Sequence, residues 1–123
     1  MNKIDFETRV TVLKSKLHRA AVTDSNLNYV GSITIDPVLM EAANLYPYEK
    51  VQIVNINNGA RFETYVIEGE SGDRGICLNG ACARLAEVGD RVIVMSYHDL
   101  PTIALNEYSP IAVMLDKENS IVV

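Results

Sequence analysis

The sequence predicts a mainly β protein, built as a small barrel closed on itself with one or two short helices. Apolar and polar residues alternate over several short runs, and polar turn clusters separate these runs. An Asn-Gly dipeptide between two such runs indicates a tight hairpin. The chain has 123 residues, 48% of them hydrophobic, which is the size of one ordinary domain. We therefore expect residues 1–123 to form a single domain whose closure removes exposed strand edges.

The first half of the chain alternates strands with turns. Short strands are predicted over residues 9–14 and 19–23, before a polar turn over 23–26. The run 28–35 also resembles a strand, although Gly31 and Ser32 lie inside it. A helix is predicted over 36–45, because Asp36 suits an N-cap and Pro37 suits the first helical position.

The second half continues the same pattern. Residues 51–56 and 61–67 are predicted to pair as a hairpin around 57–60, since Asn58-Gly59 supplies the positive φ of a tight turn. A strand over 75–78 should enter a short helix over 79–86. Further strands are expected over 91–97 and 111–115, with a turn over 116–119.

The composition disfavours several classes of function. Sixteen acidic against eleven basic residues give a net charge of −5, so a nucleic acid is not an expected partner. Neither a signal-peptide core nor an apolar run long enough to cross a bilayer is present, so we expect a soluble cytoplasmic protein. Cys77 and Cys82 lack the spacing of a zinc site and are expected to be reduced, and no metal is predicted.

The Gly31-Ser32 pair has two interpretations. Glycine in a strand commonly marks a bulge, and the next serine then only forms a hydrogen bond across it. Alternatively, Gly31 takes strained φ/ψ values that expose its carbonyl carbon to the Ser32 hydroxyl. That attack converts the amide to an ester, and elimination then cuts the chain and leaves dehydroalanine, which hydrolyses to a pyruvoyl group. A pyruvoyl group acts as an electron sink for a substrate amine.

Four blocks of sequence strengthen the second interpretation. They are Lys16-Leu17-His18-Arg19-Ala20-Ala21-Val22-Thr23, Leu27-Asn28-Tyr29-Val30-Gly31-Ser32-Ile33-Thr34-Ile35-Asp36, Asn58-Gly59-Ala60-Arg61-Phe62-Glu63-Thr64-Tyr65 and Leu78-Asn79-Gly80-Ala81-Cys82-Ala83. In this order they resemble the pyruvoyl-dependent aspartate 1-decarboxylases, over about residues 9–116. The resemblance implies a six-stranded double-psi β-barrel, a homotetramer with sites near subunit interfaces, and conversion of L-aspartate to β-alanine for pantothenate and coenzyme A synthesis.

The resemblance also implies roles for individual residues. It places cleavage between Gly31 and Ser32, giving residues 1–31 and 32–123, and makes Ser32 the pyruvoyl group that holds the substrate as a Schiff base. Tyr65 is then the proton donor after loss of CO₂, and Thr64 assists processing and contacts the substrate. Two basic residues are expected to anchor the dicarboxylate, namely Lys16 and Arg61. The expected pocket loop comprises Asn79, Gly80, Ala81 and Cys82. Two residues are expected near the cleavage site, Tyr29 and His18, although His18 is equally suited to a structural role in the barrel.

Some features depart from the family pattern or leave alternatives open. Val54 stands where many members have Trp, Cys82 stands where Ala is common, and the residues before Arg9 form an extension. An unprocessed paralogue that acts as a binding or regulatory barrel is one alternative, and a nucleic-acid-binding barrel is a weaker one. A third keeps the chemistry but takes another acidic amino acid such as glutamate. The need for a maturation factor is left open.

Overall fold

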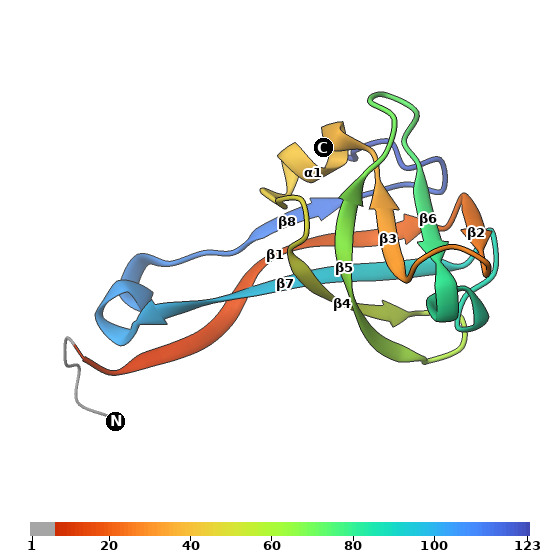
Figure 1. The fold of residues 1–123 in the computed structure, drawn as a ribbon. Coiled ribbons are helices and arrows are strands. Elements are labelled where there is room, and N and C mark those ends of the chain that lie inside the picture. Colours follow the sequence, from red (N-terminus) through yellow and green to blue (C-terminus); the bar gives the residue numbers. More distant parts are fainter. Residues whose placement is uncertain (1–6) are drawn as a thin grey trace.

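The computed structural model describes residues 7–123 and consists mainly of strands (Figure 1). The strands are β1 (Arg9–Ala21), β2 (Asp24–Asn26), β3 (Ser32–Ile35), β4 (Lys50–Asn55), β5 (Arg61–Glu68), β6 (Ile76–Asn79), β7 (Arg91–Pro101) and β8 (Ile111–Met114). The helices are α1 (Pro37–Ala42) and two 3₁₀ helices, η1 (Gly80–Arg84) and η2 (Thr102–Glu107). The predicted mainly β class is confirmed. In residues 7–123 no helix is long and apolar enough to cross a bilayer.

The eight strands are hydrogen-bonded in the order β2-β6-β3-β5-β4-β7-β1-β8. This is two more strands than the barrel implied by the resemblance, and the end strands β2 and β8 have only three and four residues. A two-residue link joins β1 to β2, although these strands lie near opposite ends of the order. Thr23 in that link donates its N–H to the Ile76 carbonyl at 2.8 Å. The sheet therefore curls back on itself around one core.

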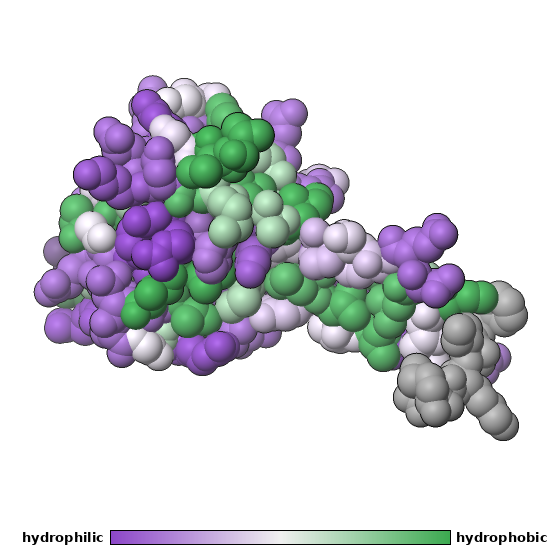
Figure 2. All heavy atoms as spheres, turned by 180° about the vertical axis from the view of Figure 1, so that it is seen from behind, coloured by the Kyte–Doolittle hydropathy of each residue, from purple (hydrophilic) through white to green (hydrophobic). Residues whose placement is uncertain are grey.

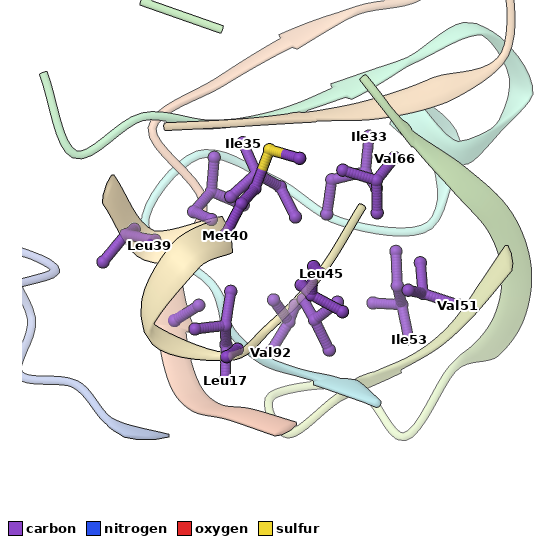
Figure 3. Close-up of a cluster of buried hydrophobic side chains, with 14 of the residues drawn as sticks. Leu17, Ile33, Ile35, Leu39, Met40, Leu45, Val51, Ile53, Val66 and Val92 are labelled. Atoms are coloured by element: carbon purple, nitrogen blue, oxygen red, sulfur yellow. The ribbon is translucent and has the colours of Figure 1, made fainter. Parts of the chain in front are cut away.

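The core is formed by the inward faces of the curled sheet and by α1 (Figure 3). In β3, Ile33 and Ile35 are fully buried and point inward, so Ser32 and Thr34 point to the opposite face. Ile76 and Leu78 are the inward residues of β6. Each fully buried side chain of this kind stabilises the fold by about 1.5–3 kcal/mol. Packing therefore fixes which side chains of β3 and β6 face outward.

The predicted separate strands over 9–14 and 19–23 are instead joined in one long strand, β1, which ends at Ala21. Register shifts against β7 between Leu13 and Ser15, and between Leu17 and Ala20, interrupt the alternation that the sequence pattern depends on. Such bulges let a strand continue while its side chains change face. The outer halves of β1 and β7, together with η2, extend away from the core (Figure 1).

The run 28–35 was expected to be continuous strand, but β3 begins only at Ser32. The residues before it form a turn, in which the Tyr29 N–H donates to the Asn26 carbonyl at 3.3 Å. The predicted helix over 36–45 is confirmed but shorter. It ends at Ala42, and Asn44 has φ +54°, a left-handed conformation that asparagine tolerates.

The Asp36 carboxylate organises the start of α1 as expected. It accepts the Val38 N–H at 2.8 Å as an N-cap, and it also accepts the N–H groups of Gly72 and Arg74 at 2.9 and 2.7 Å. These bonds tie the loop between β5 and β6 to the helix. The hairpin of β4 and β5 is also confirmed, with Gly59 at φ +77° in its turn.

Candidate active site at the Gly31-Ser32 peptide

Ser32 is the first residue of β3 and is almost fully buried, at 1% exposure. Its Oγ donates to the Val30 carbonyl at 3.3 Å and accepts a hydrogen bond from Asn79 Nδ2 at 2.9 Å. The bond to Val30 directs the hydroxyl back along the chain, over the peptide that joins Gly31 to Ser32. The hydroxyl is thus held near its own backbone and shielded from solvent.

Asn79 ends β6 directly opposite Ser32 in the antiparallel register. Its side chain is buried because it shares the outward face with Ser32 and Thr34 and lies against them. Nδ2 donates to Ser32 Oγ and also to Thr34 Oγ1, at 2.8 Å. The Cys77 thiol donates to Asn79 Oδ1 at 3.3 Å. Every polar group of this amide therefore has a partner within the site.

Gly80 follows Asn79 with φ +68°, a left-handed conformation that favours glycine. A Cβ at this position would lie 2.7 Å from Gly31 Cα and 3.0 Å from the Tyr29 carbonyl oxygen. The backbone of η1 therefore packs directly on the turn that precedes Ser32. The expected pocket loop therefore lies against the chain's own segment 29–31.

Gly31 differs from the expectation of a strained glycine. It is not among the residues with positive φ, and a Cβ added to it would meet no atom within 4 Å. The left-handed conformation belongs to Gly80 instead. The residue whose backbone conformation favours glycine is therefore Gly80 in η1, which lies across from the Gly31-Ser32 peptide bond. Gly31 itself does not have such a conformation.

Tyr65 and Thr64 lie on β5, which pairs in parallel with β3. Ile33 pairs with Val66, so the residues one position earlier, Ser32 and Tyr65, are neighbours on the same outward face. Thr64 precedes Tyr65 and pairs with Val51 of β4. The Tyr65 ring lies 6.4 Å from that of Tyr48, centroid to centroid.

The basic residues expected in the pocket lie further away within one chain. Arg61 begins β5 on the same face as Tyr65, but it lies four residue steps earlier along the strand, a distance of about 13 Å. Lys16 lies on β1, and β5, β4 and β7 stand between β1 and β3 in the sheet order. A single chain therefore brings Ser32 and Tyr65 together without Lys16.

His18 also lies on β1, and its Nδ1 is buried without a hydrogen-bond partner. Burial lowers the pKa of this imidazole, and the charges of Lys16, Arg19 and Arg91 lower it further. The ring is therefore neutral at neutral pH. Like Lys16, His18 is separated from β3 by three strands.

The remaining expected residues surround the cleavage turn or its support. Tyr29 is exposed and lines a surface hollow with Pro47, Tyr48, Ile67 and Glu68. In η1, Ala81 is exposed, whereas Cys82 is half-buried and packs against the hydrophobic core. Val54 is half-buried on β4 opposite Arg61.

Thr34 and Cys77 are site residues that the sequence interpretation missed. Both contact the Asn79 amide, and they pair directly with each other between β3 and β6. The signal was the alternation Ser32-Ile33-Thr34-Ile35 and Cys77-Leu78-Asn79, in which apolar residues mark one face and polar residues the other. Using it required knowing that these two strands pair.

The fold and the site define a mainly β protein with a buried serine hydroxyl held against its own backbone. Residues 8–122 match the family model for aspartate decarboxylase. The aspartate 1-decarboxylase of Caldicellulosiruptor bescii is 61% identical over 113 residues, covering 92% of this chain and 88% of the relative. Those of Pelotomaculum thermopropionicum and Clostridium botulinum are 61% and 58% identical, covering 92% and 91% of this chain and 86% and 88% of the relatives. The chain belongs to the aspartate decarboxylase family, which confirms the resemblance found in the sequence.

Proposed function

We propose that this chain cuts itself between Gly31 and Ser32 and then converts L-aspartate to β-alanine and CO₂, supplying pantothenate and coenzyme A synthesis. Family membership supports the overall reaction. The observation that carries the self-cleavage is the buried Ser32 hydroxyl, held between the Val30 carbonyl and Asn79 Nδ2.

Self-cleavage begins with attack of Ser32 Oγ on the Gly31 carbonyl carbon. The bond from that carbon to the Ser32 nitrogen breaks, the nitrogen takes a proton, and an ester joins Gly31 to Ser32 Oγ. Loss of the Ser32 α-proton then breaks the Cβ–Oγ bond and releases residues 1–31 with a carboxylate terminus. Thr64, on the strand β5 that pairs with β3, is proposed to assist near the developing oxyanion.

The product at position 32 is dehydroalanine, and its hydrolysis releases ammonia and leaves an N-terminal pyruvoyl group. This group supplies a ketone that draws electrons from the α-carbon of an amine substrate. The surrounding residues fit it, because Asn79 Nδ2 and Thr34 Oγ1 are hydrogen-bonding groups already beside the Ser32 side chain. Burial of the position also keeps bulk water from the reacting carbon.

Tyr65 is the proton donor in this proposal. Loss of CO₂ leaves a carbanion that needs a proton at one carbon, and a phenol on the neighbouring strand can deliver it. Its position beside Ser32, on the same outward face, supports this role. The Tyr48 ring lies beside the Tyr65 ring, at a tilt of 32°.

Lys16 and Arg61 are proposed to bind the two carboxylates of aspartate, and their placement favours a site shared between subunits. In the sheet order Lys16 is three strands away from Ser32, and Arg61 lies at the far end of β5 from Tyr65. A homotetramer in which β1 of one copy covers this face of the next would bring Lys16 and His18 to the site.

Product analysis tests the proposal. Purified protein is incubated with L-aspartate or L-glutamate, and the amines formed are separated and quantified, with Ser32→Ala as the inactive control. We expect β-alanine from aspartate, little product from glutamate and none from the variant. If the protein decarboxylated glutamate as fast as aspartate, the assignment of aspartate as its specific substrate would be wrong. A chain that stays uncut and forms no product, with or without cell extract as a source of a maturation factor, would favour the non-enzymatic binding barrel.

A further inference from the structure

Cys77 lies in the middle of β6 on the outward face, two residues before Asn79. Its backbone pairs with Thr34 on one side and with Asp24 on the other. The side chain is half-buried, and the S–H group donates to Asn79 Oδ1 at 3.3 Å. The thiol thus contacts the amide that holds the Ser32 hydroxyl.

The orientation of the Asn79 amide matters because its two ends have nearly the same shape and opposite polarity. The hydroxyls of Ser32 and Thr34 can each donate or accept, so either end of the amide could face them. The thiol is different, because its sulfur is only a weak acceptor. A flipped amide would turn its two N–H groups away from two hydroxyl acceptors and toward this sulfur, whereas the present orientation gives Oδ1 the S–H donor. Burial raises the pKa of Cys77, and the nearby Asp24 carboxylate raises it further, which keeps the thiol protonated at neutral pH.

We propose that Cys77 is a positioning residue for self-cleavage, which holds Asn79 with Nδ2 toward Ser32 Oγ. In the flipped amide, Oδ1 would accept a hydrogen bond from the Ser32 hydroxyl, and the hydroxyl would turn away from the Val30 carbonyl. The Ser32 oxygen would then lose its hydrogen bond from Asn79 Nδ2, and the hydroxyl would no longer be directed back toward the Gly31-Ser32 peptide. This inference rests on the proposed function, and it adds a residue that never touches the reacting atoms.

Two matched pairs of variants test it. Cys77→Ser keeps a donor of similar size, and Cys77→Ala removes it. Cys77→Thr and Cys77→Val repeat the comparison with larger side chains that suit a strand and differ in one hydroxyl. The rate of Gly31-Ser32 cleavage is followed by mass spectrometry under denaturing conditions, and thermal unfolding is measured on the same samples.

We expect Ser and Thr to cleave within about twofold of each other. Ala and Val should be slower than Ser and Thr, respectively, by about fivefold to tenfold, the kinetic equivalent of one neutral hydrogen bond. The unfolding temperatures should not separate the Ala and Val variants from the Ser and Thr variants in this way. Cleavage of all four variants at the wild-type rate, or rates that follow stability alone, would overturn the role of Cys77. Absence of cleavage in the wild type would instead overturn the proposed function, so the two failures are distinguishable.

Discussion

Gly80 packs against Gly31 so closely that a Cβ on Gly80 would lie 2.7 Å from Gly31 Cα. Real Cβ atoms essentially never approach another heavy atom to this distance, so any side chain at position 80 must displace the cleavage turn. Gly80 also has φ +68°. Steric room and backbone conformation therefore both require glycine here, and together they fix where the Gly31-Ser32 peptide lies relative to Asn79.

Gly80→Ala should slow or abolish self-cleavage and destabilise the fold by about 2–4 kcal/mol, since it combines a strained φ with overpacking. Gly59→Ala is the matched control. Gly59 has φ +77° but open space around it, so its substitution should cost about 1–2 kcal/mol and leave the cleavage rate unchanged. Urea unfolding and denaturing mass spectrometry check both variants. Normal cleavage in Gly80→Ala would show that this contact does not position the peptide.

Asn79→Asp should slow cleavage by about 10²–10³-fold, the size of effect seen when one donor to a reacting oxygen is removed. The aspartate side chain has nearly the same shape but lacks the N–H groups that Ser32 and Thr34 accept. Single-exponential cleavage rates at several pH values provide the measurement. A rate equal to that of the wild type at all pH values would mean that the Asn79 amide is not needed for cleavage.

Tyr65→Phe should cleave normally but lose about 10²–10⁴-fold in kcat, because it keeps the ring and removes the proton that a general acid delivers. The control is Tyr48→Phe, which keeps the ring contact with Tyr65 and changes only an exposed phenol. Steady-state β-alanine formation by fully processed protein gives kcat and KM for each. Undiminished kcat in Tyr65→Phe would assign the proton transfer to another group.

Asp36 should make the fold sensitive to acid. Burial acts to raise its pKa, but the N–H groups of Gly72, Val38 and Arg74 and the Arg74 charge together hold it below the ordinary value of 3.8. A carboxyl with a lowered folded-state pKa contributes stability above its unfolded pKa and loses it as pH falls through the folded pKa.

Asp36→Asn should therefore cost about 1.5–3 kcal/mol at pH 7, as expected when hydrogen bonds to a charged group are lost. The difference from the wild type should shrink as pH falls below about 4, because the carboxyl of the unfolded wild type is protonated first and that of the folded protein follows at lower pH. Urea unfolding at a series of pH values tests this. If the difference in unfolding free energy between the two proteins did not change with pH, the effect would come from the shape of the side chain and not from the charge of the Asp36 carboxylate.

Much of this arrangement follows from local sequence patterns, whereas the contacts across the sheet do not. The Asp36-Pro37 helix start and the Asn58-Gly59 hairpin were predictable because each depends on neighbouring residues. The continuity of β1 was not, because its bulges break the alternation and depend on pairing with β7. The position of Cys77 beside Asn79 and Thr34 could not be predicted either, because it depends on the register of β6 against β3.

The candidate site shows the same division. The Gly31-Ser32 dipeptide can be recognised in the sequence. The glycine of the site that has a left-handed conformation is Gly80, nearly fifty residues later, and its contact with the turn before Ser32 is known only from the structure. Lys16 and His18 lie in a recognisable block, yet one chain does not bring them to Ser32. Their proposed role requires a second copy of the chain, and the pattern of a single sequence does not specify how two copies would be arranged.

Intact-mass spectrometry of the purified protein under denaturing conditions, beside Ser32→Ala, is the sharpest test of self-cleavage between Gly31 and Ser32. We expect two fragments for the wild type, residues 1–31 with an ordinary carboxylate terminus and residues 32–123 with a pyruvoyl terminus, while the variant remains one chain. A wild-type protein that stays a single chain with serine at position 32, after prolonged warming and exposure to cell extract, would contradict self-cleavage.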